Sequence, residues 1–135
     1  MRMSMIGGTI LAAAVFALAA NAQQPGPGPK SVRYFSTPLE KDPTREVRLQ
    51  QQYHSPGPGT AYHTHPGDQW EVVLEGEITY MVRGQAPRVM KAGESVYIPR
   101  GTIHRNENQS GKPTRTLELL IVEKDKPQRV DAPPQ

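Results

Sequence analysis

The fold of this chain is decided by two stretches, Gly57-Pro58-Gly59-Thr60-Ala61-Tyr62-His63-Thr64-His65 and Gly93-Glu94-Ser95-Val96-Tyr97-Ile98-Pro99-Arg100-Gly101-Thr102-Ile103-His104. A His-x-His pair in an extended segment points both imidazoles to one face, because side chains alternate along a strand. A third imidazole, from His104, comes from a distant part of the chain, and a closed sheet is needed to bring it near the pair. The two stretches therefore predict a site at which His63, His65 and His104 hold one metal ion.

The chain around these stretches is predicted to be all-β. Short β-branched and aromatic runs are separated by Gly, Pro and Asn, which is typical of many short strands in a sandwich or barrel. We expect strands at residues 31–35, 46–53, 61–65, 71–75, 78–82, 88–90, 95–98, 104–106 and 117–123. Gly76-Glu77 and Arg83-Gly84-Gln85 are predicted hairpin turns. The break at Pro99-Arg100-Gly101 is predicted to return the chain so that His104 faces the other two histidines.

The N-terminal residues 1–22 are predicted to be a secretory signal peptide. Arg2 precedes an uncharged, mostly apolar run over 6–20, and Ala20-Asn21-Ala22 supplies small residues for cleavage between Ala22 and Gln23. An uncleaved anchor is the alternative, but the run is shorter than the ~20 residues that span a bilayer. We therefore expect a secreted or periplasmic protein that keeps no stable membrane anchor after cleavage.

The rest of the chain divides into three parts. Residues 23–30 form a Pro/Gly-rich spacer, residues 31–123 the barrel, and residues 124–135 a flexible tail that mixes charge and proline. The formal net charge is only +3, without a dense Lys/Arg cluster, so nucleic acid is not expected as a partner. The chain has no cysteine, and a small domain without disulfides gains stability from a metal and a partner subunit, which favours a homodimer.

The two stretches resemble the motifs of the cupin superfamily, in particular its small single-domain members. The first motif, Gly-x5-His-x-His-x3or4-Glu-x6-Gly, runs through Gly57, His63, His65, Gln69 and Gly76. The second motif, Gly-x5-Pro-x-Gly-x2-His-x3-Asn, runs through Gly93, Pro99, Gly101, His104 and Asn108. The resemblance implies a double-stranded β-helix, which is a jelly-roll-like barrel, with a metal at its mouth bound by His63, His65, Gln69 and His104.

Gln69 departs from the first motif, which has Glu at this position. An amide oxygen leaves the +2 charge of the ion intact and binds it weakly, and Gln cannot act as a general base. Glu71 lies two residues further along the strand and so on the same face. We assign Glu71 as the candidate catalytic residue, either as a hydrogen-bond partner of the site or as a proton acceptor; a solvent-facing Glu71 is the alternative.

Three neutral imidazoles select one divalent transition metal, Fe, Mn, Ni, Cu, Co or Zn. Several cupin dioxygenases also use three histidines, and this resemblance implies an exported, dioxygenase-like enzyme that acts on a small enolisable or phenolic molecule. Two alternatives stay open. One is a non-catalytic periplasmic cupin that binds a small ligand or a metal, and the other is a cupin isomerase or lyase with Glu71 as its base.

Two expectations concern residues outside the motifs. His54 is predicted to be an exposed side chain at the end of a strand. Some of the aromatic residues are expected to line the cavity, because small-molecule pockets are mostly apolar and aromatic; these residues are Tyr53, Tyr62, Trp70, Tyr80 and Tyr97.

Overall fold

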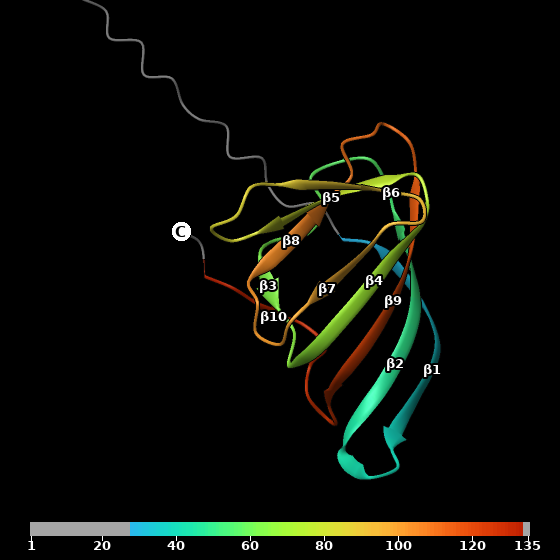
Figure 1. The fold of residues 1–135 in the computed structure, drawn as a ribbon, viewed down its shortest axis with the longest axis vertical. Coiled ribbons are helices and arrows are strands. Elements are labelled where there is room, and N and C mark those ends of the chain that lie inside the picture. The colour runs from blue at the N-terminus through green and yellow to red at the C-terminus, as the bar shows by residue number, and fades with distance from the viewer. Residues whose placement is uncertain (1–27, 134–135) are drawn as a thin grey trace, which may run out of the picture.

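The computed structural model describes residues 28–133, which form ten strands in two five-stranded antiparallel sheets that face each other (Figure 1). The strands are β1 (Lys30–Leu39), β2 (Asp42–His54), β3 (His63–Thr64), β4 (Gly67–Glu75), β5 (Glu77–Val82), β6 (Arg88–Lys91), β7 (Ser95–Ile98), β8 (His104–Glu107), β9 (Thr114–Glu123) and β10 (Val130–Asp131). The first sheet has the order β1-β2-β9-β4-β7 and the second the order β10-β3-β8-β5-β6. This is the predicted all-β, jelly-roll-like fold.

Residues 1–27 and 134–135 lie outside the described part. The predicted signal peptide (1–22) and most of the predicted spacer (23–30) therefore lie outside the described residues. Within residues 28–133, no helix is long and apolar enough to cross a membrane.

Alternation along the strands decides which side chains enter the barrel. In β9, buried and half-buried residues alternate without a break from Thr114 to Glu123. Thr116, Glu118 and Leu120 point inward, whereas Leu117 and Leu119 point outward. Because β9 lies between β2 and β4 in the sheet, its inward carboxyl enters the middle of the barrel.

The apolar core occupies one part of the interior. It consists of Val73, Ile78, Tyr80, Met90 and Ile98, which come from β4, β5, β6 and β7 and pack between the two sheets. Burying a side chain of this size contributes roughly 1.5–3 kcal/mol. The inward positions of β2 and β9 are mostly polar, so the remaining interior is free to form a hydrophilic site.

The predicted hairpin at Gly76-Glu77 is wrong. β4 pairs with β7 and β9 in the first sheet, whereas β5 pairs with β6 and β8 in the second. Gly76, at a φ of 79°, carries the chain from one sheet to the other. Turn residues signal a change of direction, but they do not say which neighbour the next strand will choose.

The other two predicted reversals are confirmed. β5 and β6 form a hairpin closed by Arg83-Gly84-Gln85, with Tyr80 opposite Arg88. Pro99-Arg100-Gly101 takes the chain from β7 in the first sheet to β8 in the second. His104 thereby reaches the sheet that holds His63.

The structure differs from the expected flexible tail over 124–135. β10 pairs with β3, with Val130 opposite Thr64 and Asp131 opposite His63. The Ala132 amide also donates to the Tyr62 carbonyl at 2.8 Å. From its composition, a charged, proline-containing tail is expected to lie in solvent. Composition does not show that β3 has a free edge with which the tail can pair. We call residues 124–133 the C-terminal strap.

Candidate metal centre

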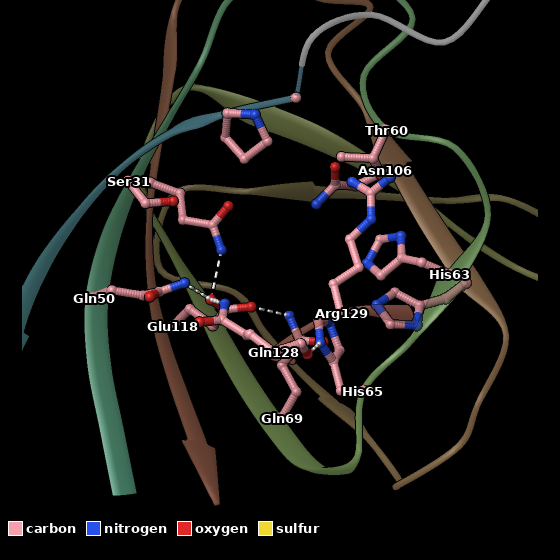
Figure 2. A pocket seen from close by; sticks show the side chains of 14 residues that line it. Ser31, Gln50, Thr60, His63, His65, Gln69, Asn106, Glu118, Gln128 and Arg129 are labelled. Carbon is pink, nitrogen blue, oxygen red and sulfur yellow. Dashed lines mark hydrogen bonds between the residues drawn. The ribbon is translucent and has the colours of Figure 1, made fainter. Parts of the chain in front are cut away.

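The three histidines converge because β3 and β8 are neighbours. His63 lies directly opposite His104 in the antiparallel register. Their ring centroids are 4.5 Å apart, and the His65 centroid lies 5.0 Å from that of His63 and 5.2 Å from that of His104. One nitrogen of each ring lies within 4.8 Å of the other two, so the rings can share one ion (Figure 2).

Each imidazole is oriented by a backbone carbonyl. The Nδ1 atoms lie 2.8 Å from the Ala61 oxygen for His63, 2.6 Å from the Gln128 oxygen for His65, and 2.9 Å from the Thr102 oxygen for His104. A carbonyl oxygen only accepts, so each Nδ1 carries the proton and each Nε2 keeps its lone pair. Histidine ligands are commonly fixed in this way in metal sites.

Burial keeps the three rings neutral. It lowers the pKa of His63 to about 3 and the pKa of His65 to about 4, and it lowers the pKa of His104 as well. The backbone hydrogen bonds oppose this shift but do not overcome it. The buried Nε2 of His65 has no hydrogen-bond partner among residues 28–133. A neutral donor set with an unused lone pair fits a divalent transition metal.

Gln69 is held so that its oxygen is left free. Its Nε2 donates to Glu118 Oε1 at 2.7 Å and to Glu71 Oε2 at 3.0 Å. Its Oε1 is buried and has no partner within the described part of the chain. An unmade buried hydrogen bond costs about 1–3 kcal/mol. Gln69 lines the same cavity as the histidines, so this orphaned oxygen supports its predicted role as a metal ligand.

Glu71 is 1 % exposed, which excludes the solvent-facing alternative. It is not among the residues that line the cavity and lies behind the Gln69 amide. Burial by itself would raise the pKa of Glu71, but the nearby imidazole of His54 outweighs burial and holds this pKa below its ordinary value. Glu71 is therefore a buried anion beside the site.

Glu118 is the site residue that the sequence did not reveal. It lies opposite Glu71 on β4 and opposite Gln50 on β2, and it lines the cavity. It accepts hydrogen bonds from Gln50, from Gln52 at 2.6 Å and from Gln69. Burial, with the nearby charge of Glu71, raises the pKa of Glu118 to about 8. The pKa shifts of the two carboxyl groups run in opposite directions, so Glu118 holds a proton more readily than Glu71 does. The only signal of Glu118 in the sequence was a charged residue at an inward position of an apolar strand.

The prediction of an exposed His54 is wrong. This side chain is buried, with Nε2 at 3.1 Å from Thr116 Oγ1 and 3.8 Å from Glu71 Oε1. β2 continues to His54 with its even-numbered residues inward, as Gln50 and Gln52 are. His54 therefore belongs to the polar interior and supports Glu71.

The cavity in front of the histidines measures about 200 Å³. Among the described residues that line it, none is a phenylalanine, tyrosine, tryptophan or large aliphatic; most carry amide, hydroxyl, imidazole or charged groups. The expected aromatic lining is therefore wrong. Tyr53, Trp70 and Tyr97 are exposed on the outside, and Tyr80 belongs to the apolar core.

Comparison with known proteins agrees with this geometry. Residues 52–122, more than half of the chain, match the family described as Cupin domain. The chain belongs to the cupin family. It is 36% identical over 64 residues to the uncharacterized protein YdbB of Bacillus subtilis (strain 168), a match that covers 47% of this cupin and 53% of YdbB, so it spans about half of that relative.

Two solved structures share the fold. An uncharacterized conserved protein with a double-stranded β-helix domain from Klebsiella pneumoniae superposes with a TM-score of 0.62 at 18% identity, over 85% of this cupin and 95% of that chain. The DMSP lyase DddQ from Ruegeria pomeroyi gives a TM-score of 0.62 at 20% identity, over 85% of this cupin and 59% of that chain. At these identities the likeness establishes the double-stranded β-helix alone.

The lowered histidine pKa values predict how stability depends on pH in metal-free protein. Between about pH 4 and 6.5 the unfolded chain binds protons at these histidines and the folded protein does not, so the free energy of unfolding rises with pH. Each imidazole adds up to about 1.4 kcal/mol per pH unit. Glu118, whose pKa is raised, opposes this trend above pH 4.5 but is one group against three. Urea unfolding of EDTA-treated protein measures the slope, and it should be shallower for His65→Asn; an equal slope would contradict the assignment.

Gln69→Glu restores the carboxylate of the motif but removes the amide that bridges Glu71 and Glu118. Without metal, we expect this variant to lose about 1–3 kcal/mol of unfolding free energy at neutral pH, because two buried acceptors lose their donor. Added Zn(II) should stabilise the variant more than the wild type, because a carboxylate binds the ion better than an amide does. Gln85→Glu, the same change in an exposed hairpin, is the control. Equal unfolding midpoints of metal-free Gln69→Glu and wild type would refute the bridging role.

Proposed function

We propose that this cupin is a metal-dependent, dioxygenase-like enzyme that acts on a small, polar, enolisable molecule. The observation that supports this most is the donor set, in which three neutral imidazoles and the orphaned oxygen of Gln69 face one cavity. A divalent ion bound there would keep its full charge, with which it polarises a substrate oxygen and shares electrons with O₂.

In this proposal the other steps, which are holding the ion and moving a proton, fall to different residues of the chain. His63, His65 and His104 hold the ion, and Gln69 offers a weak oxygen ligand. Glu118 lines the cavity, and burial raises its pKa, so it is the carboxyl group suited to exchange a proton with a bound enol or enolate. Glu71 acts through Gln69, whose amide it helps to orient. The catalytic role predicted for Glu71 therefore passes to Glu118 in this proposal, and Glu71 becomes a positioning residue.

The cavity favours small polar substrates over phenolic ones. One water molecule occupies about 30 Å³ of liquid, so a cavity of about 200 Å³ accepts a molecule of limited size. Its described lining offers hydrogen-bonding groups in place of an aromatic face. Of the two expected substrate classes, the enolisable one is therefore retained.

Oxygen consumption tests this function. A dioxygenase breaks a carbon–carbon bond of the substrate and places both atoms of O₂ in the products, without an added reductant. We expect protein reconstituted with Fe, Mn, Ni, Cu, Co or Zn to consume one O₂ per enolisable substrate with at least one of these metals, and ¹⁸O₂ to label the products. His63→Ala, which lacks one ligand, is the inactive control. Activity that survives chelation would end the proposal.

A lyase or isomerase is the second candidate, and Glu118 favours it. A protonated carboxyl beside a metal-bound carbonyl or enolate is suited to proton transfer, which needs no O₂. Turnover in an anaerobic chamber, lost in Glu118→Gln, would select this candidate. Stoichiometric capture of a ligand without any product would instead indicate the non-catalytic binding protein.

We also propose a homodimer that forms through the outer face of the first sheet. Phe35, Leu49, Leu119, Trp70 and Tyr97 stand opposite one another across β1, β2, β9, β4 and β7. Phe35, Trp70 and Tyr97 are 45, 41 and 50 % exposed, and the Trp70 and Tyr97 rings stack at 5.0 Å. A contiguous apolar row of this width is typical of an interaction site.

Leu119→Glu, in the middle of this row, should convert the dimer to a monomer, because it places a charge in the apolar contact. Size-exclusion chromatography with light scattering measures the mass. Val89→Glu is the control, because Val89 is an exposed apolar residue on β6 of the second sheet, away from the row. A monomeric wild type, or a Leu119→Glu dimer, would contradict the proposal.

Export is the last part of the proposal. The apolar run over 6–20 and the small residues at Ala20 and Ala22 support cleavage before Gln23 and a secreted or periplasmic location. The mass of the protein recovered from the periplasm or medium should begin at Gln23; a cytoplasmic protein that retains Met1 would refute export.

A further inference from the structure

Three residues that line the cavity are not among the proposed metal ligands or their hydrogen-bond partners. Thr60 and Asn106 are 4 and 7 % exposed and line the cavity together with Arg129. Thr60 Oγ1 and Asn106 Oδ1 are buried and have no hydrogen-bond partner among residues 28–133. In Figure 2 the Arg129 side chain extends from the C-terminal strap toward Asn106 and Thr60. Buried polar groups are normally paired, so the unpaired Thr60 hydroxyl, which can donate, indicates a partner that a ligand supplies. The Asn106 Oδ1 atom only accepts, so Asn106 can contact an oxyanion through its Nδ2 group alone.

From this wall we propose that Thr60, Asn106 and Arg129 form a subsite for one oxyanion of a small dianionic ligand, such as a dicarboxylate. The other end of the ligand then reaches the histidines. The inference rests on the proposed function only in that the second end needs the metal. The subsite narrows the small polar substrate of the proposed function to a dianion.

The backbone builds this subsite in advance. Gly59 has a φ of 67°, and a Cβ there would lie 1.9 Å from the Asn106 carbonyl oxygen. This close approach lets the Thr60 amide donate to the same oxygen at 3.2 Å. Thr60 and Asn106 are therefore fixed beside each other by main-chain contacts that involve neither side chain. Their side-chain polar groups remain available to a ligand.

Arg129 retains free donors although it has an ion-pair partner. Its Nε donates to Asp131 Oδ1 at 2.7 Å, and one terminal nitrogen lies 2.5 Å from the same oxygen. A guanidinium has five N–H groups in a planar fork, so the others can bind a carboxylate. The Asp131 carboxylate is 68 % exposed, and solvent weakens its hold on the arginine.

The strap holds Arg129 at the cavity. The carbonyl of the preceding residue, Gln128, accepts the Nδ1 proton of His65 at 2.6 Å. The Gln128 side-chain oxygen accepts a hydrogen bond from Arg33 at 2.7 Å. β10 then pairs with β3 just beyond Arg129. Metal ligand and anion-binding arginine are thus positioned by consecutive residues of one segment.

The charges of the lining favour an anion. Among the described lining residues Arg129 is the cationic side chain and Glu118 the acidic one. Glu118 already accepts hydrogen bonds from four glutamines, Gln50, Gln52, Gln69 and Gln128. A neutral apolar molecule would leave the Thr60 hydroxyl, the Asn106 Nδ2 group and the remaining N–H groups of Arg129 without partners. A molecule with oxygen atoms at both ends can accept from these donors and also reach a metal at the histidines.

Titration calorimetry with malonate tests the proposal, on metal-free and on Zn(II)-loaded protein. We expect Arg129→Gln to weaken malonate binding at least tenfold, which corresponds to about 1.4 kcal/mol, without a change in Zn(II) affinity. Thr60→Val should weaken it several-fold and leave the unfolding midpoint unchanged or higher, because the lost hydroxyl has no protein partner. Malonamide, of the same shape without charge, should bind weakly to all variants. Arg88→Gln, exposed on β6, is the control.

The outcomes separate this inference from the proposed function. Arg129-dependent malonate binding in a protein that takes up none of Fe, Mn, Ni, Cu, Co and Zn would refute the metal-dependent enzyme and leave the subsite standing. Equal malonate binding by wild type and Arg129→Gln would overturn the subsite whether or not Zn(II) binds. Equal losses in Arg129→Gln and Arg88→Gln would show a general charge effect and overturn it too, as would a wild type that binds no malonate at millimolar concentration.

Discussion

Each of the three imidazoles donates a hydrogen bond from Nδ1 to a backbone carbonyl, and the rest of the site depends on this constraint. For His63 and His104 the carbonyl lies two residues earlier in the chain, so the local strand conformation suffices. For His65 the carbonyl belongs to Gln128, 63 residues away. His63 and His104 are therefore oriented by the barrel itself. His65 is oriented only when the C-terminal strap pairs with β3. The strap is as much a part of the metal centre as the motifs are.

The same barrel has to accommodate two unlike interiors. Val73, Ile78, Met90 and their neighbours form the apolar part, whose burial supplies the main driving force for folding. The inward faces of β2 and β9 bring Gln50, Gln52 and Glu118 into contact instead. Such a buried network stabilises a fold only if its members satisfy one another, because each unpaired group is costly in a low dielectric. Here the donors of four glutamines, Gln128 of the strap among them, converge on Glu118, whereas the groups that remain unpaired at the cavity are those available to an ion or a ligand.

The sequence predicted what local spacing can determine. His63, His65 and His104 were found because their separations fit strand alternation and a reversal at Pro99-Arg100-Gly101, and the all-β fold followed from short runs between turn residues. The role of Gly76 was missed, because the choice between a hairpin and a change of sheet is made by strands that pair with β4 and β5 from elsewhere in the chain. Glu118 and Arg129 were missed for the same reason. Each lies in a segment of unremarkable composition and enters the site only through pairing with β2, β4 or β3.

The Gln at position 69 then explains the charge of the whole centre. A Glu there would stand within hydrogen-bonding distance of both Glu71 and Glu118, and three carboxyls in contact could not all remain ionised. With Gln, one amide donates to both carboxyl groups, and no third carboxyl is added beside the histidines. A divalent ion held there would keep more of its positive charge than it would beside a glutamate ligand, and Arg129, although paired with Asp131, adds a cation to the cavity lining. The departure from the family motif and the cation on the strap therefore favour the same class of ligand, an anion.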